Sequence, residues 1–167
     1  TLVLRLVEMI SDVGIERLLM QRQTMPTDAL LAALHGASVL RGLAMAALLV
    51  MLAFPMAMAF DGGADATSYA LLALVPMIRG WLHLGYRLSE RDLRLWPLAV
   101  VEGGAVVAML ASLPVALLIW GDQRAMLAVL IVQPAAQVAL SHLVANTRYQ
   151  IAFNREVLIE VLGFGAP

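Results

Sequence analysis

The sequence has no cysteine and no lysine, and it carries little charge of either sign. The absence of cysteine excludes disulfides and cysteine-bound metal sites. Its 11 arginines and 12 acidic residues give a net charge of −1, which argues against a nucleic-acid partner because binding along phosphates requires an excess of positive charge. Charged residues make up only 14% of the chain, whereas they are about a quarter of an average soluble domain.

Hydrophobic residues dominate instead. They make up 62% of the 167 residues, and the mean hydropathy is +0.86. Apolar stretches of roughly 20 residues recur along the chain, and each is long enough to cross about 30 Å of hydrocarbon as a helix. The sequence therefore predicts an all-α, polytopic membrane protein.

Five apolar runs predict membrane-crossing helices, and short connections such as "DGGADATS" and "WGDQ" predict that they pair as antiparallel hairpins. A short amphipathic helix is expected after Pro26 and Thr27. Prolines inside the runs are expected to bend them: Pro55, Pro76, Pro114 and Pro134. The predicted helices cover residues 1–21, 38–59, 67–86, 98–120 and 125–145 and form a membrane domain over 1–145.

The arginines predict the orientation of these helices. The connection from Tyr86 to Trp96 holds three arginines and the tail holds two, whereas "DGGADATS" has none. By the positive-inside rule, the arginine-rich connections and the tail are cytoplasmic. In that tail, Asn154 can cap an amphipathic helix, so residues 146–167 are expected to form a cytoplasmic linker at the membrane surface.

The opening stretch "TLVLRLVEMISDVG" has neither an initiator Met nor the basic start, short apolar core and cleavage site of a signal peptide. We expect the chain to begin inside a larger protein. Arg5, Glu8, Asp12 and Glu16 follow one another at spacings of three and four residues, so they share one helical face. That face either lines a cavity, where a carboxylate takes up a proton or cation, or consists of ion pairs and headgroup contacts.

A second basic face runs from Arg79 through His83 to Arg87 and continues to Arg91 and Arg94. Arginine forks suit a phosphate or diphosphate. The structural interpretation of the last three arginines is that they mark the cytoplasmic side and pair with acidic neighbours and lipid headgroups.

Deeper in the predicted membrane region, Arg79 and Arg41 are candidate ligands for a phosphate, although each could also reach the interface with its long side chain. Glu102, beside Gly103-Gly104, is expected to pair with Arg79 or Arg41, with a proton-coupling role as the alternative. Gln133, Gln137, Ser141 and His142 form a polar stripe that either bonds between helices or lines a wet cavity.

Enzyme signatures are missing from the sequence. There is no nucleophile elbow, paired-histidine motif or phosphate loop. His35, His83 and His142 lie far apart along the chain, without the spacing of a metal site. We therefore expect no enzyme, no metal and no cofactor.

Four segments, taken in order, carry a family resemblance: "LVEMISDVGIERLLMQ", "VLRGLAMAALL", "LVPMIRGWLHLGYRLSERDLRLWPLAVVEGG" and "ALSHLVANTRYQIAFNREVLIEVLGFG". Together they resemble the N-terminal half of Wzx-type oligosaccharide flippases. These are polysaccharide biosynthesis membrane proteins of the superfamily that includes the multidrug and toxin extrusion transporters.

The resemblance implies one lobe of a two-lobe fold around a central cavity, in the bacterial inner membrane. Helix one, the start of helix two and the second lobe would be partners outside this sequence, together with membrane lipids. The implied activity is flipping of an undecaprenyl-diphosphate-linked oligosaccharide by alternating access. Arg41, Arg79 and Arg5 would contact the diphosphate, and Glu8, Asp12 and Glu102 would couple to an ion or form ion pairs.

Two alternatives remain at this stage. A drug or metabolite extruder on the same fold would have a more apolar cavity with fewer arginines in the membrane. A membrane module that transports nothing would use every one of these charges for ion pairs or headgroup contacts.

Overall fold

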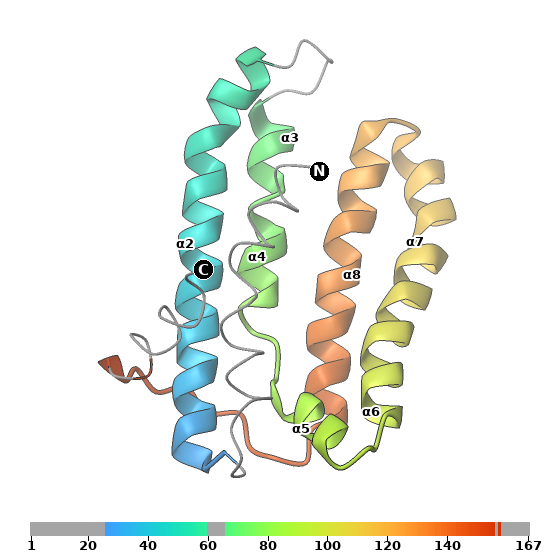
Figure 1. Cartoon of the computed structure of the whole chain (residues 1–167). Coiled ribbons are helices and arrows are strands. Elements are labelled where there is room, and N and C mark those ends of the chain that lie inside the picture. Colours follow the sequence, from blue (N-terminus) through green and yellow to red (C-terminus); the bar gives the residue numbers. More distant parts are fainter. Residues whose placement is uncertain (1–25, 60–65, 156, 158–167) are drawn as a thin grey trace.

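A computed structural model describes residues 26–59, 66–155 and 157 of the chain (Figure 1). The described residues are helical or irregular and include no strand, which confirms the all-α class. Helices are numbered as in Figure 1: α2 (Asp28–Ala59), α3 (Ala66–Leu71), α4 (Leu74–Arg79), α5 (Gly85–Arg91), α6 (Trp96–Leu98), the π-helix η1 (Ala99–Gly103), α7 (Gly104–Trp120) and α8 (Gln123–Val144).

The helices form two antiparallel pairs that stand side by side (Figure 1). In one pair α2 packs against α3 and α4, and in the other α7 packs against α8. Contacts between α4 and α8 join the pairs. Among the described residues, three helices are long and apolar enough to cross a membrane: Asp28–Ala59, Trp96–Trp120 and Gln123–Val144. They overlap the runs expected over 38–59, 98–120 and 125–145, whereas the run over 1–21 lies outside the described residues.

Helix α2 begins ten residues before the predicted span. Thr27 caps it, since its Oγ1 accepts a hydrogen bond from the amide of Leu30 (3.3 Å). The expectation of a separate short helix here is wrong. Nothing between Asp28 and Ser38 interrupts the backbone bonding, and the helix continues unbroken to Ala59.

The run predicted as one helix over 67–86 is divided into three pieces. Proline at position 76 has no amide to bond the carbonyl of Leu72, and its ring crowds that carbonyl. Leu72 O instead accepts from the amide of Val75 (3.1 Å), a tighter bond that separates α3 from α4. After Arg79 the chain leaves the helix and turns below the bundle into α5 (Figure 1). The apolar helical part, Ala66–Arg79, is therefore shorter than the prediction.

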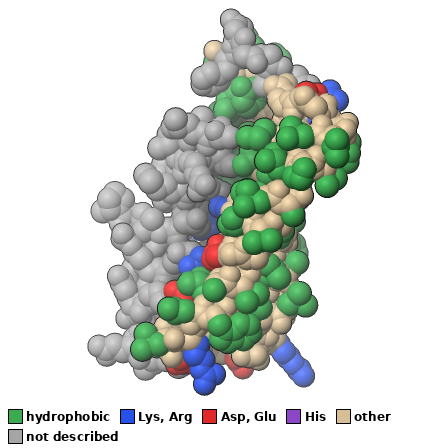
Figure 2. All heavy atoms as spheres, turned by 90° about the vertical axis from the view of Figure 1, so that its right-hand side faces the viewer, with side chains coloured by type: hydrophobic (Ala, Val, Ile, Leu, Met, Phe, Trp, Pro, Cys, Tyr) green, Lys and Arg blue, Asp and Glu red, His purple; other side chains and the backbone are tan. Residues whose placement is uncertain are grey.

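The outer side of α7 is hydrophobic and exposed. Val107, Leu110 and Leu118 are 66%, 57% and 88% exposed, as expected for side chains that face lipid. Figure 2 looks onto this side and shows charged side chains at its lower end, along one edge and, in a small group, at its upper end. The lower end in Figures 1 and 2 includes the arginine-rich connection, so we name it the basic end. By the positive-inside rule it is the predicted cytoplasmic end.

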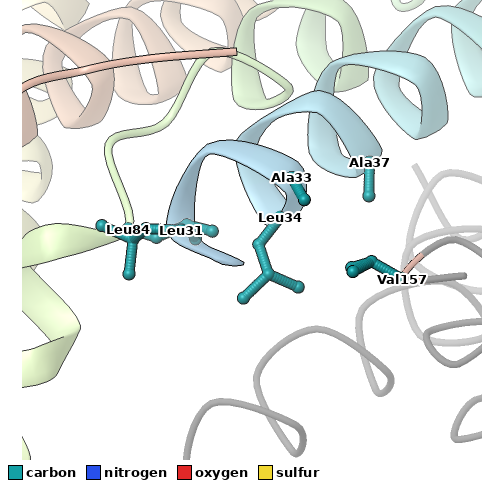
Figure 3. Close-up of a cluster of buried hydrophobic side chains, with 6 residues drawn as sticks. All are labelled: Leu31, Ala33, Leu34, Ala37, Leu84 and Val157. Carbon is teal, nitrogen blue, oxygen red and sulfur yellow. The ribbon is translucent and has the colours of Figure 1, made fainter. Parts of the chain in front are cut away.

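The chain after α8 crosses the basic end without helical structure over residues 145–154 (Figure 1). We name this segment the strap. Most of the amphipathic helix expected after Asn154 lies outside the described residues. Val157 is described and buried, and Figure 3 shows its side chain beside Ala37 and Leu34 of α2. The start of the predicted linker is therefore packed on the membrane helices.

Candidate functional site

The π-helix η1 presents Glu102 to the inside of the bundle. A π-turn holds one extra residue per turn and so rotates the side chains that follow it, and such turns are frequent at functional sites. Gly104 then allows α7 to approach α8 closely, because a Cβ there would lie 2.7 Å from Leu140 Cδ1. Apart from its own helix, no atom of the described residues lies within 4 Å of a Cβ built on Gly103. The predicted role in helix approach therefore belongs to Gly104 alone.

Glu102 accepts hydrogen bonds from two other elements. The hydroxyl of Tyr86 in α5 donates to its Oε1 (3.0 Å), and Nε2 of Gln137 in α8 donates to its Oε2 (2.7 Å). Each carboxylate oxygen thus has one neutral donor. This confirms interhelical bonding for Gln137.

Arg87 provides the positive charge of this cluster. Its guanidinium lies 3.8 Å from Glu102 Oε1 and 4.0 Å from Glu90 Oε1, and it stands 5.4 Å from the centre of the Tyr86 ring. Sequence spacing suggests Arg79 or Arg41 as the partner of Glu102, and the structure gives Arg87 instead. The reason is the break after Arg79, which sends the chain around the basic end and returns Tyr86 and Arg87 toward η1.

The Glu102 cluster consists of Tyr86, Arg87, Glu102 and Gln137. Burial raises the pKa of the Tyr86 hydroxyl above its usual value, so it remains protonated and serves as a donor. The Glu102 side chain is 40% exposed and that of Arg87 is 20% exposed. The cluster therefore offers a fixed carboxylate and a guanidinium that a polar or charged ligand can reach.

Arg41 and Arg79 lie at one level of the α2–α4 pair. Each precedes a glycine, and the two glycines bring the helix backbones together. A Cβ on Gly42 would lie 3.0 Å from Gly80 Cα, and a Cβ on Gly80 would lie 3.0 Å from Ser38 O. Both arginines are half-buried. The other predicted charges, Arg5, Glu8 and Asp12, lie outside the described residues.

Three histidines that are distant in sequence meet at the basic end. The rings of His35 and His83 are 5.0 Å apart, and those of His83 and His142 are 5.2 Å apart. Their positions along the chain show no sign of this meeting, since they indicate only that the spacing is not that of a metal site. Spacings of 48 and 59 residues are far too long to place side chains on one helical face. The local sequence shows only that a glycine follows two of the histidines closely, Gly36 after His35 and Gly85 after His83.

These histidines are not a metal site in the described part of the chain, where no group of three His, Cys, Asp or Glu side chains is arranged for an ion. Nε2 of His142 bonds the carbonyl of Trp81 (3.1 Å). Ser141 Oγ accepts from the amide of His83 (3.0 Å) and donates to Val138 O (2.7 Å). Part of the polar stripe of α8 thus holds the connection between α4 and α5 in place.

Comparison with known families gives one match, which covers residues 1–167 and is described as polysaccharide biosynthesis protein. The chain belongs to this family. Neither the curated proteins nor the solved structures include a significant match to it. Membership in the polysaccharide biosynthesis family, together with the long apolar helices, makes the chain a membrane protein with a role in polysaccharide biosynthesis.

Proposed function

We propose that this polysaccharide biosynthesis protein is the N-terminal lobe of a Wzx-type flippase. The lobe would move an undecaprenyl-diphosphate-linked oligosaccharide across the bacterial inner membrane. The observation that carries the proposal is the pair of half-buried arginines, Arg41 and Arg79, at one level of the apolar α2–α4 pair.

A diphosphate with attached sugars cannot cross hydrocarbon unaided, because its charges and hydroxyls would lose their hydration. Guanidinium groups inside the bundle replace water with bidentate, charge-assisted hydrogen bonds. Arginine in a membrane segment is costly and is usually retained for function. The Glu102 cluster supports the same proposal, since it adds a carboxylate, a guanidinium and an amide where α5, η1 and α8 meet.

The proposal includes partners beyond this chain. A second lobe would complete the cavity, and membrane lipids would surround the apolar face of α7. Alternating access between two lobes would expose the arginines first to the cytoplasm and then to the outer side. The mechanism requires no cofactor and no chemical step.

The test replaces Arg41 and Arg79 by Ala, singly and together, in the full-length protein. Surface polysaccharide is then measured in cells that lack their own flippase. Each arginine that binds phosphate contributes about 1.5–3 kcal/mol, so each single variant should lower the export rate about tenfold or more at unchanged protein level.

The matched control is Arg94→Ala, because Arg94 is exposed on the α5–α6 connection and should retain normal export. Normal polymer in the Arg41/Arg79 double variant at normal protein level would refute the phosphate-binding role. In that case the arginines would serve the structure of a membrane module.

A further inference from the structure

The strap crosses the basic end of the bundle and is fixed there by its backbone. The carbonyl of Thr147 accepts from Nε2 of His83 (3.0 Å), and the carbonyl of Gln150 accepts from Nδ1 of His35 (3.1 Å). Farther along, the amide of Ala152 donates to the carbonyl of Ala32 in α2 (2.9 Å). Two histidines and one helix carbonyl therefore hold three points of the strap.

The second nitrogen of each ring bonds the connection between α4 and α5. Nε2 of His35 accepts from the amide of Leu84 (3.1 Å), and Nδ1 of His83 accepts from the amide of Gly85 (3.0 Å). An amide can only donate and a carbonyl can only accept, so these bonds define the tautomer of each ring. Both rings are neutral, and each joins the strap to residues 84–85.

Burial keeps these rings neutral. His35 is 0% exposed and His83 is 1% exposed. For His83, which lies in the connection between helices, burial lowers the pKa below its usual value. The bond to the Thr147 carbonyl opposes this lowering, and the nearby His142 adds to it. A second proton on either ring would also break a bond to a backbone amide.

Tyr149 fills the space between the rings. Its ring centre is 4.5 Å from that of His35, 4.7 Å from that of His142 and 5.5 Å from that of His83. Its hydroxyl oxygen is buried and has no hydrogen-bond partner among the described residues. The ring therefore accounts for the position of Tyr149, and the hydroxyl does not.

Two glycines make room for the strap. A side chain on Gly36 would collide with the carbonyl group of Ala152, and a Cβ on Gly85 would lie 2.6 Å from Thr147 Oγ1. Val157, just beyond the strap, packs on α2 (Figure 3). The basic end of the bundle is thus shaped to receive this segment of its own chain.

We propose that His35, His83 and Tyr149 form a clasp that locks the strap to the basic end and thereby positions Tyr86 and Arg87 at Glu102. The connection runs through consecutive residues: the clasp rings bond the amides of Leu84 and Gly85, and the next two side chains contact Glu102. The clasp residues are positioning residues. Their importance for transport rests on the proposed function. The existence of the clasp does not depend on that function.

Hydrogen–deuterium exchange on the full-length protein tests the clasp without any substrate. Gly36→Ala should push the strap away without changing any clasp side chain, and Tyr149→Ala should remove the ring that fills the cluster. In both variants the amide of Ala152 should exchange hydrogen for deuterium at least about tenfold faster than in the wild type. The amides of Leu84 and Gly85 should accelerate with it. The α7–α8 hairpin should exchange at its normal rate, which verifies that the variants fold.

Two matched controls accompany these variants. Gly103→Ala adds the same methyl group where no described residue outside its own helix lies within 4 Å. Tyr149→Phe keeps the ring and removes only the hydroxyl, which bonds none of the described residues. Both should exchange like the wild type. The clasp is refuted if the strap amides keep their rate in Tyr149→Ala. The positioning role is refuted if the strap amides accelerate while Leu84 and Gly85 stay protected.

The transport assay separates this inference from the proposed function. If the function is right, Tyr149→Ala should lower surface polysaccharide at normal protein level, and Tyr149→Phe should not. If the Arg41/Arg79 variants export normally, the proposed function fails, whereas the exchange result still decides the clasp.

Discussion

Glu102→Gln should destabilise the protein and lower polysaccharide export. The variant keeps an oxygen for the Tyr86 hydroxyl, and the Gln137 amide must turn over to accept from the new NH₂ group. It also removes the negative charge from beside Arg87. Replacing charge-assisted hydrogen bonds by neutral ones and losing the ion pair costs about 1–3 kcal/mol. Because Glu102 is 40% exposed, we expect the lower end of this range, measured as the unfolding free energy in detergent.

A charge exchange tests whether the cluster acts as a unit. In the double variant Glu102→Gln/Gln137→Glu, the carboxylate moves to α8 while the opposing amide can still donate to it. This variant should recover most of the stability that Glu102→Gln loses, since residues in one hydrogen-bond network are not additive. Glu90→Gln is the matched control, because Glu90 meets the same guanidinium at 4.0 Å and its loss should have a smaller effect. Equal losses for both single variants would contradict the central position of Glu102.

The membrane helices follow from the sequence because their signal is long and local. Roughly 20 apolar residues in a row have few structures available in a bilayer, and "WGDQ" stops the chain where it is expected to turn. Gly121 there has φ of 65° and Asp122 caps α8 by accepting from the amide of Arg124 (2.8 Å). Each of these features depends only on neighbouring residues.

The pairing of polar groups does not follow from the sequence in the same way. Assigning Arg87 to Glu102 requires knowing that the helix ends at Arg79 and that η1 adds a residue to one turn. The sequence does indicate a bend at Pro76, but that proline separates α3 from α4. After the helix end at Arg79, the amide of His83 donates to Ser141 Oγ of α8, a contact between distant segments. The extra residue in η1 has no residue signature: Ala99–Gly103 reads like any helical turn, and packing against α8 and α5 decides its shape.

The histidine clasp could not be predicted from the sequence either, and its residues lie even farther apart along the chain. His35, His83 and Tyr149 come from three separate segments, and their partners are mostly backbone groups. Backbone carbonyls and amides are identical at every residue, so no sequence pattern can identify which of them a ring will bond. The two glycines that admit the strap are visible in the sequence, but their purpose depends on the fold.

Gly42→Ala should disrupt the pairing of α2 with α4 and so displace Arg41 and Arg79, two of the predicted phosphate ligands. The added Cβ would lie 2.5 Å from Pro76 O and 3.0 Å from Gly80 Cα. Both are backbone atoms, and neither can rotate away, so the helices must separate. In membranes, small residues allow helices to pack closely, and this packing stabilises the helix pair because no hydrophobic force drives helices together there. We expect a loss of about 1–3 kcal/mol in unfolding free energy, measured by denaturation in detergent.

Gly103→Ala is the control for this prediction, because it adds the same methyl group to a helical glycine with open space around it. That variant should be neutral, or more stable by about 0.5–1 kcal/mol, since alanine restricts the unfolded chain more than glycine does. Export should fall in Gly42→Ala even where the protein level is normal, because Arg41 and Arg79 each precede a glycine of this crossing. Normal stability and normal export in Gly42→Ala would mean that the close approach of α2 and α4 does not set the position of the arginines.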